Sequence, residues 1–268
     1  MTTTVEIEGY LEQRLELLVG LGLYATKSEA VRDAVRHMLE KTDLTAIVVD
    51  MYSTGKVSLG FCTQACELSA EEFLMVLQRR GVRPHLGEES MQELEKKTPL
   101  FNDDRRMLVE GYTFSVLFDN LGADVLTRLL PRLSVAEPQL EKMPFEPRRL
   151  LLSSLDSSDS SGTLLPVRGF EEASAGSGLS YGEAAALAAA KKNRLLLVAD
   201  DFYVRSVAEK SGVESASGIA LVLWCLGRDL ITQEDALVSF EKMFSKGYYL
   251  PLSPAELSAH ALASKVSQ

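Results

Sequence analysis

One short segment, the sequence Leu-Leu-Leu-Val-Ala at 195–199, constrains the fold of this chain more than any other feature. Five consecutive apolar residues are typical of a strand that is buried on both faces, as in a parallel sheet that helices cover on each side. The run ends in Asp200 and Asp201, with an Ala-rich helical segment before it at 182–192 and another helical segment after it at 202–210. Strands that alternate with helices predict an α/β fold for this part of the chain.

Two more strands of the same sheet are expected upstream, at 107–109 and 133–136, with a helix at 118–130 between them. The tract at about 153–163 is rich in Ser and Asp, which is typical of a mobile loop. We therefore expect residues 105–268 to form one α/β/α domain with a parallel sheet.

The first 41 residues follow a different pattern. Alternating apolar and polar residues at 3–8 predict a short strand, and a helical stripe follows at 11–19. A second helix is expected to begin at Thr26 or Ser28, since either side chain can cap it. One strand and two helices cannot enclose a core within about 40 residues. We therefore expect this segment to form a homodimer that shares apolar surface between two copies.

Residues 42–98 predict a small all-helical module, with short helices at 44–52, 58–66 and 70–79. Ser69 is a candidate N-cap for the third of these helices. Two short helices around a tight turn are compatible with a helix-turn-helix. The expected domains are therefore 1–41, 42–98 and 105–268.

Composition limits the functions that are open to the chain. The 28 Lys and Arg residues against 38 Asp and Glu residues give a net charge of -10, so any nucleic-acid binding must depend on a local patch. Three cysteines cannot form a disulfide framework and are typical of the reducing cytoplasm, where we expect the protein. The longest apolar run, at 218–226, is too short to span a bilayer, so we expect no membrane partner.

The N-terminal segment resembles the ribbon-helix-helix family of DNA-binding regulators, on Thr-Thr-Val-Glu-Ile-Glu at 3–8 and Tyr-Ala-Thr-Lys-Ser-Glu at 24–29. In that family two chains pair their strands into a ribbon that enters the major groove, and the second helix holds phosphates at its start. The resemblance implies nucleic-acid contacts by Thr2, Thr4, Glu6, Thr26, Lys27 and Ser28. Glu6 departs from the family because an acidic side chain repels phosphate, so a dimerisation module without DNA binding is the alternative.

The middle segment resembles a small helical family of antitoxin-like proteins, on Gly-Lys-Val-Ser-Leu-Gly at 55–60 and Arg-Gly-Val at 80–82. The alternative for this segment is a packing module between domains. The C-terminal segment is similar to PIN domains of the VapC type, on Leu-Ser-Tyr-Gly-Glu-Ala at 179–184 and on the strand at 195–199 with its two aspartates. The whole chain thus resembles a VapB-like antitoxin fused to a VapC-like toxin.

The PIN resemblance implies catalytic and metal-binding roles for Glu110, Glu183, Asp200 and Asp201. Mg²⁺ and Mn²⁺ prefer oxygen ligands, and such a metal generates the hydroxide that cuts RNA. The family usually carries an aspartate directly after its first strand, whereas this chain has Glu110, whose longer side chain would shift the metal. The loss of one ligand can abolish metal binding and leave the fold intact.

Two functions therefore remain open from the sequence. The first is a homodimeric DNA-binding regulator of toxin–antitoxin type whose fused PIN-like domain is degenerate or inhibited and needs no cofactor. The second is a Mg²⁺- or Mn²⁺-dependent endoribonuclease, with RNA as its substrate, that its own antitoxin module holds in check. Glu110 in the place of the usual aspartate favours the first, and the retained Glu183, Asp200 and Asp201 favour the second. A fused antitoxin has a high effective concentration over the toxin site, so we expect no constitutive nuclease activity. A third hypothesis is a scaffold that binds no nucleic acid, and the acidic net charge supports it.

Overall fold

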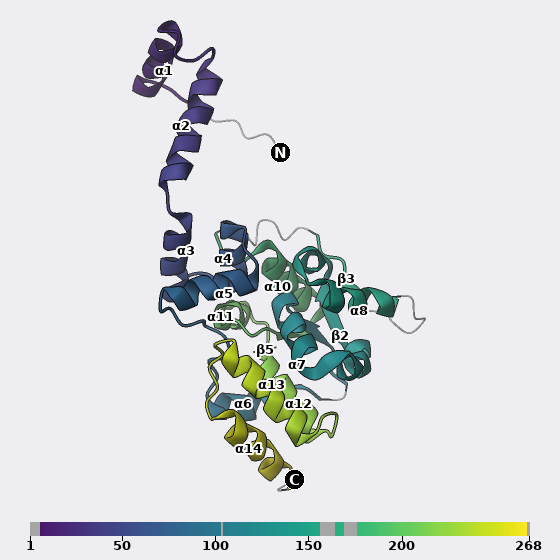
Figure 1. Cartoon of the computed structure of the whole chain (residues 1–268). Coiled ribbons are helices and arrows are strands. Elements are labelled where there is room, and N and C mark those ends of the chain that lie inside the picture. Colours follow the sequence, from purple (N-terminus) through teal and green to yellow (C-terminus); the bar gives the residue numbers. More distant parts are fainter. Residues whose placement is uncertain (1–5, 103, 156–163, 169–175, 267–268) are drawn as a thin grey trace. The chain divides into compact units, whose positions relative to one another are not determined.

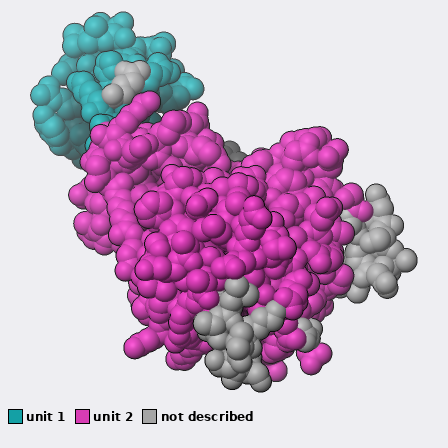
Figure 2. Space-filling view, turned by 60° about the horizontal axis from the view of Figure 1, so that its bottom comes forward, with its two compact units in different colours: residues 1–47 teal, residues 48–268 magenta. Residues whose placement is uncertain are grey.

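The computed structural model describes residues 6–102, 104–155, 164–168 and 176–266 (Figure 1). The chain forms two compact units, residues 1–47 and residues 48–268 (Figure 2). Among the described residues, no helix combines the length and the apolar character that crossing a bilayer requires.

Unit 1 contains helices α1 (Tyr10–Gly20) and α2 (Lys27–Lys41), so both predicted helices are present. The Thr26 side chain caps α2 by accepting a hydrogen bond from the Glu29 amide. The strand expected at 3–8 falls partly on residues 1–5, which lie outside the described residues, and residues 6–8 belong to no strand. The ribbon-helix-helix fold therefore stays a prediction.

Unit 2 is mostly helical and contains a parallel sheet of five strands in the order β3-β2-β1-β4-β5. The strands are β1 (Met107–Val109), β2 (Leu133–Ala136), β3 (Leu164–Leu165), β4 (Leu196–Val198) and β5 (Ser215–Ala216). The parallel sheet and the strands expected at 107–109, 133–136 and 195–199 are confirmed. Strands β3 and β5 have two residues each, which is too short for a periodic signal in the sequence.

Alternate residues of the strands enter different cores, because successive side chains of a strand point to opposite faces. Met107 and Val109 pack into one core, and Leu108 packs into the other. The first core is covered by α7 (Gly111–Leu129), α12 (Gly218–Gly227), α13 (Gln233–Ser245) and α14 (Pro254–Val266). The second core is covered by α10 (Tyr181–Asn193) and α11 (Phe202–Lys210). This burial on both faces explains the continuous apolar run in β4.

Four α-helices lie between α2 and β1 in the chain: α3 (Leu44–Ser53), α4 (Leu59–Cys66), α5 (Ala70–Arg79) and α6 (Met91–Lys97). Ser69 caps α5 in a reciprocal pair with Glu72, as expected. The buried side chains of Tyr52, Phe73 and Leu86 belong to the same core as β1. These helices and the sheet therefore pack as one unit, and the division into domains at 42–98 and 105–268 stays a prediction.

The segment that joins α5 to α6 is hydrogen-bonded to the end of β4. The Gly87 amide donates to the Asp200 carbonyl at 3.0 Å, and the Phe202 amide donates to the His85 carbonyl at 2.9 Å. On its other side, the Leu86 carbonyl accepts from the Tyr249 amide at 2.8 Å. Residues 85–87 are thus hydrogen-bonded on one side to the chain at the end of β4 and on the other side to Tyr249.

The remaining described elements are α8 (Phe145–Leu155) and the 3-10 helices η1 (Thr98–Leu100), η2 (Leu130–Arg132) and η3 (Glu137–Lys142). The helix predicted at 118–130 begins earlier than expected, since α7 starts seven positions before residue 118. Glu110 caps α7 and Ser90 caps α6, so each cap sets the start of its helix. Most of the expected Ser-rich loop lies outside the described residues.

We predict that Leu86→Ala destabilises unit 2 as a whole. Leu86 is fully buried in the shared core, so its truncation costs about 2–5 kcal/mol of unfolding free energy. Urea unfolding followed by the fluorescence of Trp224 and by hydrogen exchange of peptides from α5 and β4 should shift to lower urea concentration together. Leu152→Ala, at a position that is 44% exposed, is the control and should change stability by less than about 0.5 kcal/mol. Separate transitions would contradict a single cooperative unit.

Candidate functional site

The candidate site lies where β1 and β4 end side by side. In the strand order β3-β2-β1-β4-β5, the chain changes direction across the sheet between β1 and β4, and ligands of open α/β sheets bind at such a point. Glu110 follows β1, Asp200 and Asp201 follow β4, and Glu183 lies in the first turn of α10. The topology thus brings the four predicted carboxylates to one edge of the sheet.

Glu110 turns its carboxylate back onto the helix that follows it. Its two oxygens accept from the Tyr112 and Thr113 amides, both at 2.9 Å, and so cap α7. The Gln139 side-chain amide donates to the same carboxylate at 3.4 Å. Burial, and to a smaller degree the charge of Glu183, raise the pKa of Glu110 to about 7.

Glu183 is fixed from two sides. Its carboxylate accepts from the Ser180 amide at 2.7 Å, which completes the N-terminal cap of α10. It also accepts from the Ser58 hydroxyl at 2.5 Å and from the Gly60 amide at 3.2 Å, both at the start of α4. Burial raises the pKa of Glu183, and the hydrogen bonds from Ser58, Ser180 and Gly60 oppose this shift.

Asp201 is held in the same manner. One oxygen caps α11 by accepting from the Tyr203 and Val204 amides at 2.7 and 3.3 Å. The other oxygen accepts from the Leu59 amide of α4 at 2.6 Å. Burial and then the charge of Glu183 raise the pKa of Asp201 to about 7.

The N-termini of four helices therefore converge on three buried carboxylates. The helices α7, α10 and α11 carry Glu110, Glu183 and Asp201 at or near their own starts, and α4 approaches from an earlier part of the chain. Each helix start offers amide donors that have no partner within the helix, together with a partial positive charge. The carboxylates are thus compensated by the chain itself.

Asp200 points away from this group. Its carboxylate accepts from the Gly218 amide at 2.7 Å and from the Tyr248 hydroxyl at 2.8 Å. Burial raises the pKa of Asp200 to about 6, and the bonds from Tyr248 and Gly218 counteract the shift. The side chain holds the start of α12 to the end of β4, which is a structural task.

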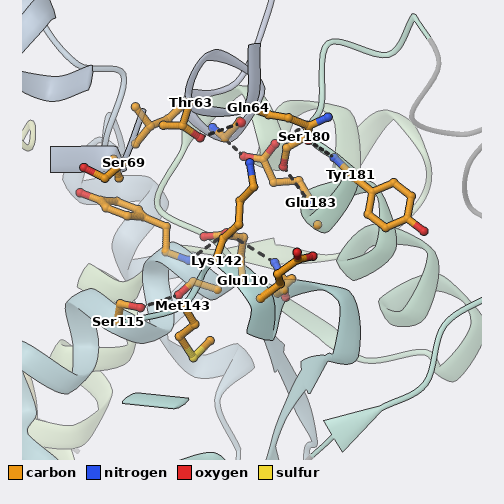
Figure 3. A pocket seen from close by; sticks show the side chains of 18 of the residues that line it. Thr63, Gln64, Ser69, Glu110, Ser115, Lys142, Met143, Ser180, Tyr181 and Glu183 are labelled. Carbon is orange, nitrogen blue, oxygen red and sulfur yellow. Dashed lines mark hydrogen bonds between the residues drawn. The ribbon is translucent and has the colours of Figure 1, made fainter. Parts of the chain in front are cut away.

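A cavity of about 310 Å³ opens beside the three carboxylates (Figure 3). Glu110, Glu183 and Asp201 line it, whereas Asp200 does not. Helices α4 and α5 form one wall, and the other wall comes from α7, η3 and the start of α10. Lys142 also lines this space, which gives it one basic side chain. The cavity therefore lies between segments far apart in the sequence.

The carboxylates of the site are held by hydrogen bonds from the chain itself. Among the described residues, no group of three or more His, Cys, Asp or Glu side chains is placed to hold a metal ion. Every carboxylate oxygen of Glu183 and Asp201 already accepts a hydrogen bond from the chain. Metal binding and catalysis by Glu110, Glu183, Asp200 and Asp201 stay predictions, as does Mg²⁺ or Mn²⁺ as cofactor.

Three residues of α4 and its cap were not predicted to belong to the site: Ser58, Leu59 and Gly60. They fall within the motif Gly-Lys-Val-Ser-Leu-Gly, and the serine before a helical stripe is an N-cap signal. The motif indicates a helix start, but it carries no information on what that start contacts 123 and 125 residues later in the chain.

The candidate nucleic-acid residues lie in unit 1. Thr2 and Thr4 fall outside the described residues, and Glu6 is exposed. Thr26 and Ser28 lie at the exposed start of α2. Lys27, beside them, forms ion pairs with Glu12 at 3.2 Å and Glu16 at 2.7 Å. Their contact with DNA stays a prediction.

Comparison with protein families identifies two parts of the chain. Residues 164–263 match a PIN domain family (DUF3368). Residues 32–95 match an uncharacterised protein family (UPF0175), which is antitoxin-like. No curated protein and no solved structure matches the chain. The protein thus carries an antitoxin-like N-terminal region and a C-terminal PIN domain, which is the composition of a toxin–antitoxin-type protein.

We predict a pH-dependent contribution of Glu110 to stability. Its pKa rises from an ordinary 4.5 to about 7 on folding, so the folded chain keeps this proton to higher pH than the unfolded chain. Unfolding then releases a proton between about pH 4.5 and pH 7, and the unfolding free energy falls as the pH rises. Glu110→Gln, which does not titrate, should gain stability relative to wild type from pH 5 to pH 8 in urea unfolding.

The control for this prediction is Glu146→Gln, at an exposed glutamate of α8. Its stability relative to wild type should change little over the same pH range. A Glu110→Gln variant whose relative stability is independent of pH would contradict the raised pKa.

Proposed function

We propose that this protein, an antitoxin-like region fused to a PIN domain, is a homodimeric DNA-binding regulator of toxin–antitoxin type whose PIN domain is inactive. The observation that carries the proposal is the contact of α4 with Glu183 and Asp201. The antitoxin-like region supplies three of the donors to these carboxylates, and the caps of α10 and α11 supply the others. Carboxylates that are engaged in this way are less available to a metal ion, which supports an inactive PIN domain.

Dimerisation is supported by the apolar surface of unit 1. Helix α1 has no buried residue, and Val35, Met38 and Leu39 of α2 are exposed by 46–59% in a single copy. Exposed apolar side chains at this spacing lie on one helix face, and a contiguous apolar surface favours association. A second copy of unit 1 is the partner that the resemblance to two-chain regulators favours.

We predict that Val35→Asp separates the dimer. Val35 is exposed by 46% in a single copy, so the charge costs the monomer little, but it would be buried in a dimer without a partner. Sedimentation equilibrium should show a mass that falls to that of one chain. Arg36→Asp, on the adjacent exposed position, is the control and should leave the mass unchanged. A wild type of one-chain mass would contradict dimerisation.

DNA binding is supported by the start of α2. The amides of the first helical turn are natural donors for a phosphate group, and Lys27 adds a positive charge beside them. The ion pairs of Lys27 with Glu12 and Glu16 are solvent-exposed, so a phosphate can displace them at small cost. Binding then depends on this local patch and overcomes the net charge of -10.

We predict that Lys27→Ala weakens binding to 40-base-pair duplexes selected from a randomised pool. The loss of one phosphate contact should reduce the salt dependence, as the slope of log K against log salt, by about 1. Lys41→Ala, at the opposite end of α2, is the control and should bind as wild type does. A wild type that enriches no duplex in this selection would overturn the DNA-binding part of the proposal.

A second function is favoured by a specific observation, the retention of Glu110, Glu183 and Asp201 around one cavity. These side chains would act as the metal ligands of a ribonuclease once the antitoxin-like region moved away from them. Cleavage of RNA by the wild-type chain with Mn²⁺, abolished by Glu183→Gln, would favour this enzyme over the inactive domain.

A further inference from the structure

A group of exposed basic side chains lies where the parallel strands start, at the edge of the sheet opposite to the carboxylates. Arg106 directly precedes β1, and Arg194 stands two positions before β4. Lys191 and Lys192 lie in the last turn of α10, and Lys210 is the last residue of α11. All five side chains are exposed. We call these five residues the basic edge.

The topology brings the members of the basic edge together. Strands β1 and β4 are parallel neighbours, and the Leu196 amide donates to the Arg106 carbonyl at 3.3 Å. The residues that precede these two strands therefore lie side by side. Helices α10 and α11 each connect two parallel strands, so each runs from the ends of the strands back to their starts. Both helices cover the same core, and their C-termini reach the same edge.

The positive charge of the basic edge is not neutralised by the chain. Apart from Arg106, its members form no ion pair or side-chain hydrogen bond within the part of the chain that the structure describes. Two nearby acids are already paired, since Glu214 binds Arg105 and Glu209 lies 3.0 Å from the Lys97 ammonium. In a chain of net charge -10, a positive group of this kind marks a local site for a polyanion.

Two further acids, Asp103 and Asp104, precede Arg106 in the sequence. The five cations of the basic edge still outnumber them. Basic residues in the last turn of a helix also complement the helix dipole, which accounts for Lys191 and Lys192 in part. That effect acts only within a helix's own last turn, so it does not account for Arg106 before β1.

The surroundings of the basic edge favour a duplex over a single strand. Proteins that bind single-stranded nucleic acid combine basic groups with aromatic side chains on which the bases stack. The residues next to the basic edge, at 104–106, 191–194 and 210–212, include no aromatic residue. A duplex keeps its bases stacked inside and presents its phosphates outward, so ammonium and guanidinium groups suffice to bind it.

We propose that the basic edge binds the phosphate backbone of duplex DNA. The inference rests on the proposed function and adds a second DNA contact to the start of α2. Contacts to phosphates add affinity and carry no sequence information, so base readout stays with unit 1. The PIN domain would then serve the regulator as a DNA anchor, which requires no catalysis.

The test measures fluorescence anisotropy of labelled 40-base-pair duplexes with the full-length chain. One duplex is taken from the selection with wild type, and the other is drawn from the unselected pool. The edge variant combines Lys191→Gln, Lys192→Gln and Arg194→Gln. The control variant combines three substitutions at exposed positions outside the edge, with the same loss of charge: Lys41→Gln, Lys56→Gln and Arg79→Gln.

The edge variant should bind both duplexes at least about tenfold more weakly than wild type at about 50 mM salt, and to the same degree. Its slope of log K against log salt should fall by about 2–3, since each lost phosphate contact removes about 1. The control variant should bind within about twofold of wild type, although its net charge is the same.

The inference is overturned if the edge variant binds as the control does, or if it loses affinity for the selected duplex alone. It is also overturned if a single-stranded RNA of the same length loses more affinity than the duplex, because the edge would then bind RNA. Failure of the proposed function has a different signature: wild type does not prefer the selected duplex, while the edge variant still binds both duplexes more weakly. Absence of binding by wild type to either duplex overturns both.

Circular dichroism checks the fold of each variant. If the triple edge variant does not fold, the double variant Lys191→Gln with Lys192→Gln replaces it, because both side chains are exposed in the last turn of α10. The salt slope should then fall by about 1–2, and an unchanged slope would overturn the inference.

Discussion

The structure depends on the compensation of three carboxylates buried at the end of a parallel sheet. Removing such groups from water is costly unless hydrogen bonds or opposite charges replace the solvent. Glu110, Glu183 and Asp201 obtain these bonds from helix starts, since each caps the helix that carries it. Helix α4 supplies the remaining donors for Glu183 and Asp201. The position of α4 is therefore set by the same requirement that sets the starts of α7, α10 and α11.

The buried carboxylates also link the antitoxin-like region to the PIN domain. An antitoxin on a separate chain must find its toxin, whereas a fused one acts at a high effective concentration. Here the fused region also shares the hydrophobic core of the sheet through Phe73 and Leu86. The contact at the acidic site is one part of a larger interface, and its polar bonds determine which carboxylate oxygens are free. The contact that occupies the carboxylate oxygens thus also contributes to the stability of unit 2.

Unit 1 presents the opposite situation. Thr26 caps α2, but α1 and α2 leave apolar side chains exposed because two helices enclose too little volume. Unit 2 closes its own hydrophobic core, whereas unit 1 leaves apolar side chains exposed. The proposed regulator requires two kinds of part: a segment that forms dimers and binds DNA, and a domain that folds by itself.

The sequence by itself determined the local elements. The apolar run at 195–199 indicated a doubly buried strand, and Thr26 and Ser69 marked helix starts, because these signals depend on neighbours within a few residues. The sequence also placed Glu110 and Asp201 directly after strands, which parallel topology carries to one edge. The sequence did not indicate that Asp200 and Asp201 have different roles, although adjacent residues at a strand end point in different directions.

Only the tertiary structure decided what the carboxylates do. Whether Glu183 meets a cation or the Ser58 hydroxyl depends on a contact between residues 125 positions apart, and no local pattern encodes it. The same holds for Gly60, whose missing side chain has meaning only beside Glu183. The buried Arg205 guanidinium binds backbone carbonyls and lies near Glu89, which no neighbouring residue in the sequence indicates. Hydrogen bonds and close packing of this kind arise when distant segments meet, which is why the fold, and not the motif, determined the chemistry of the site.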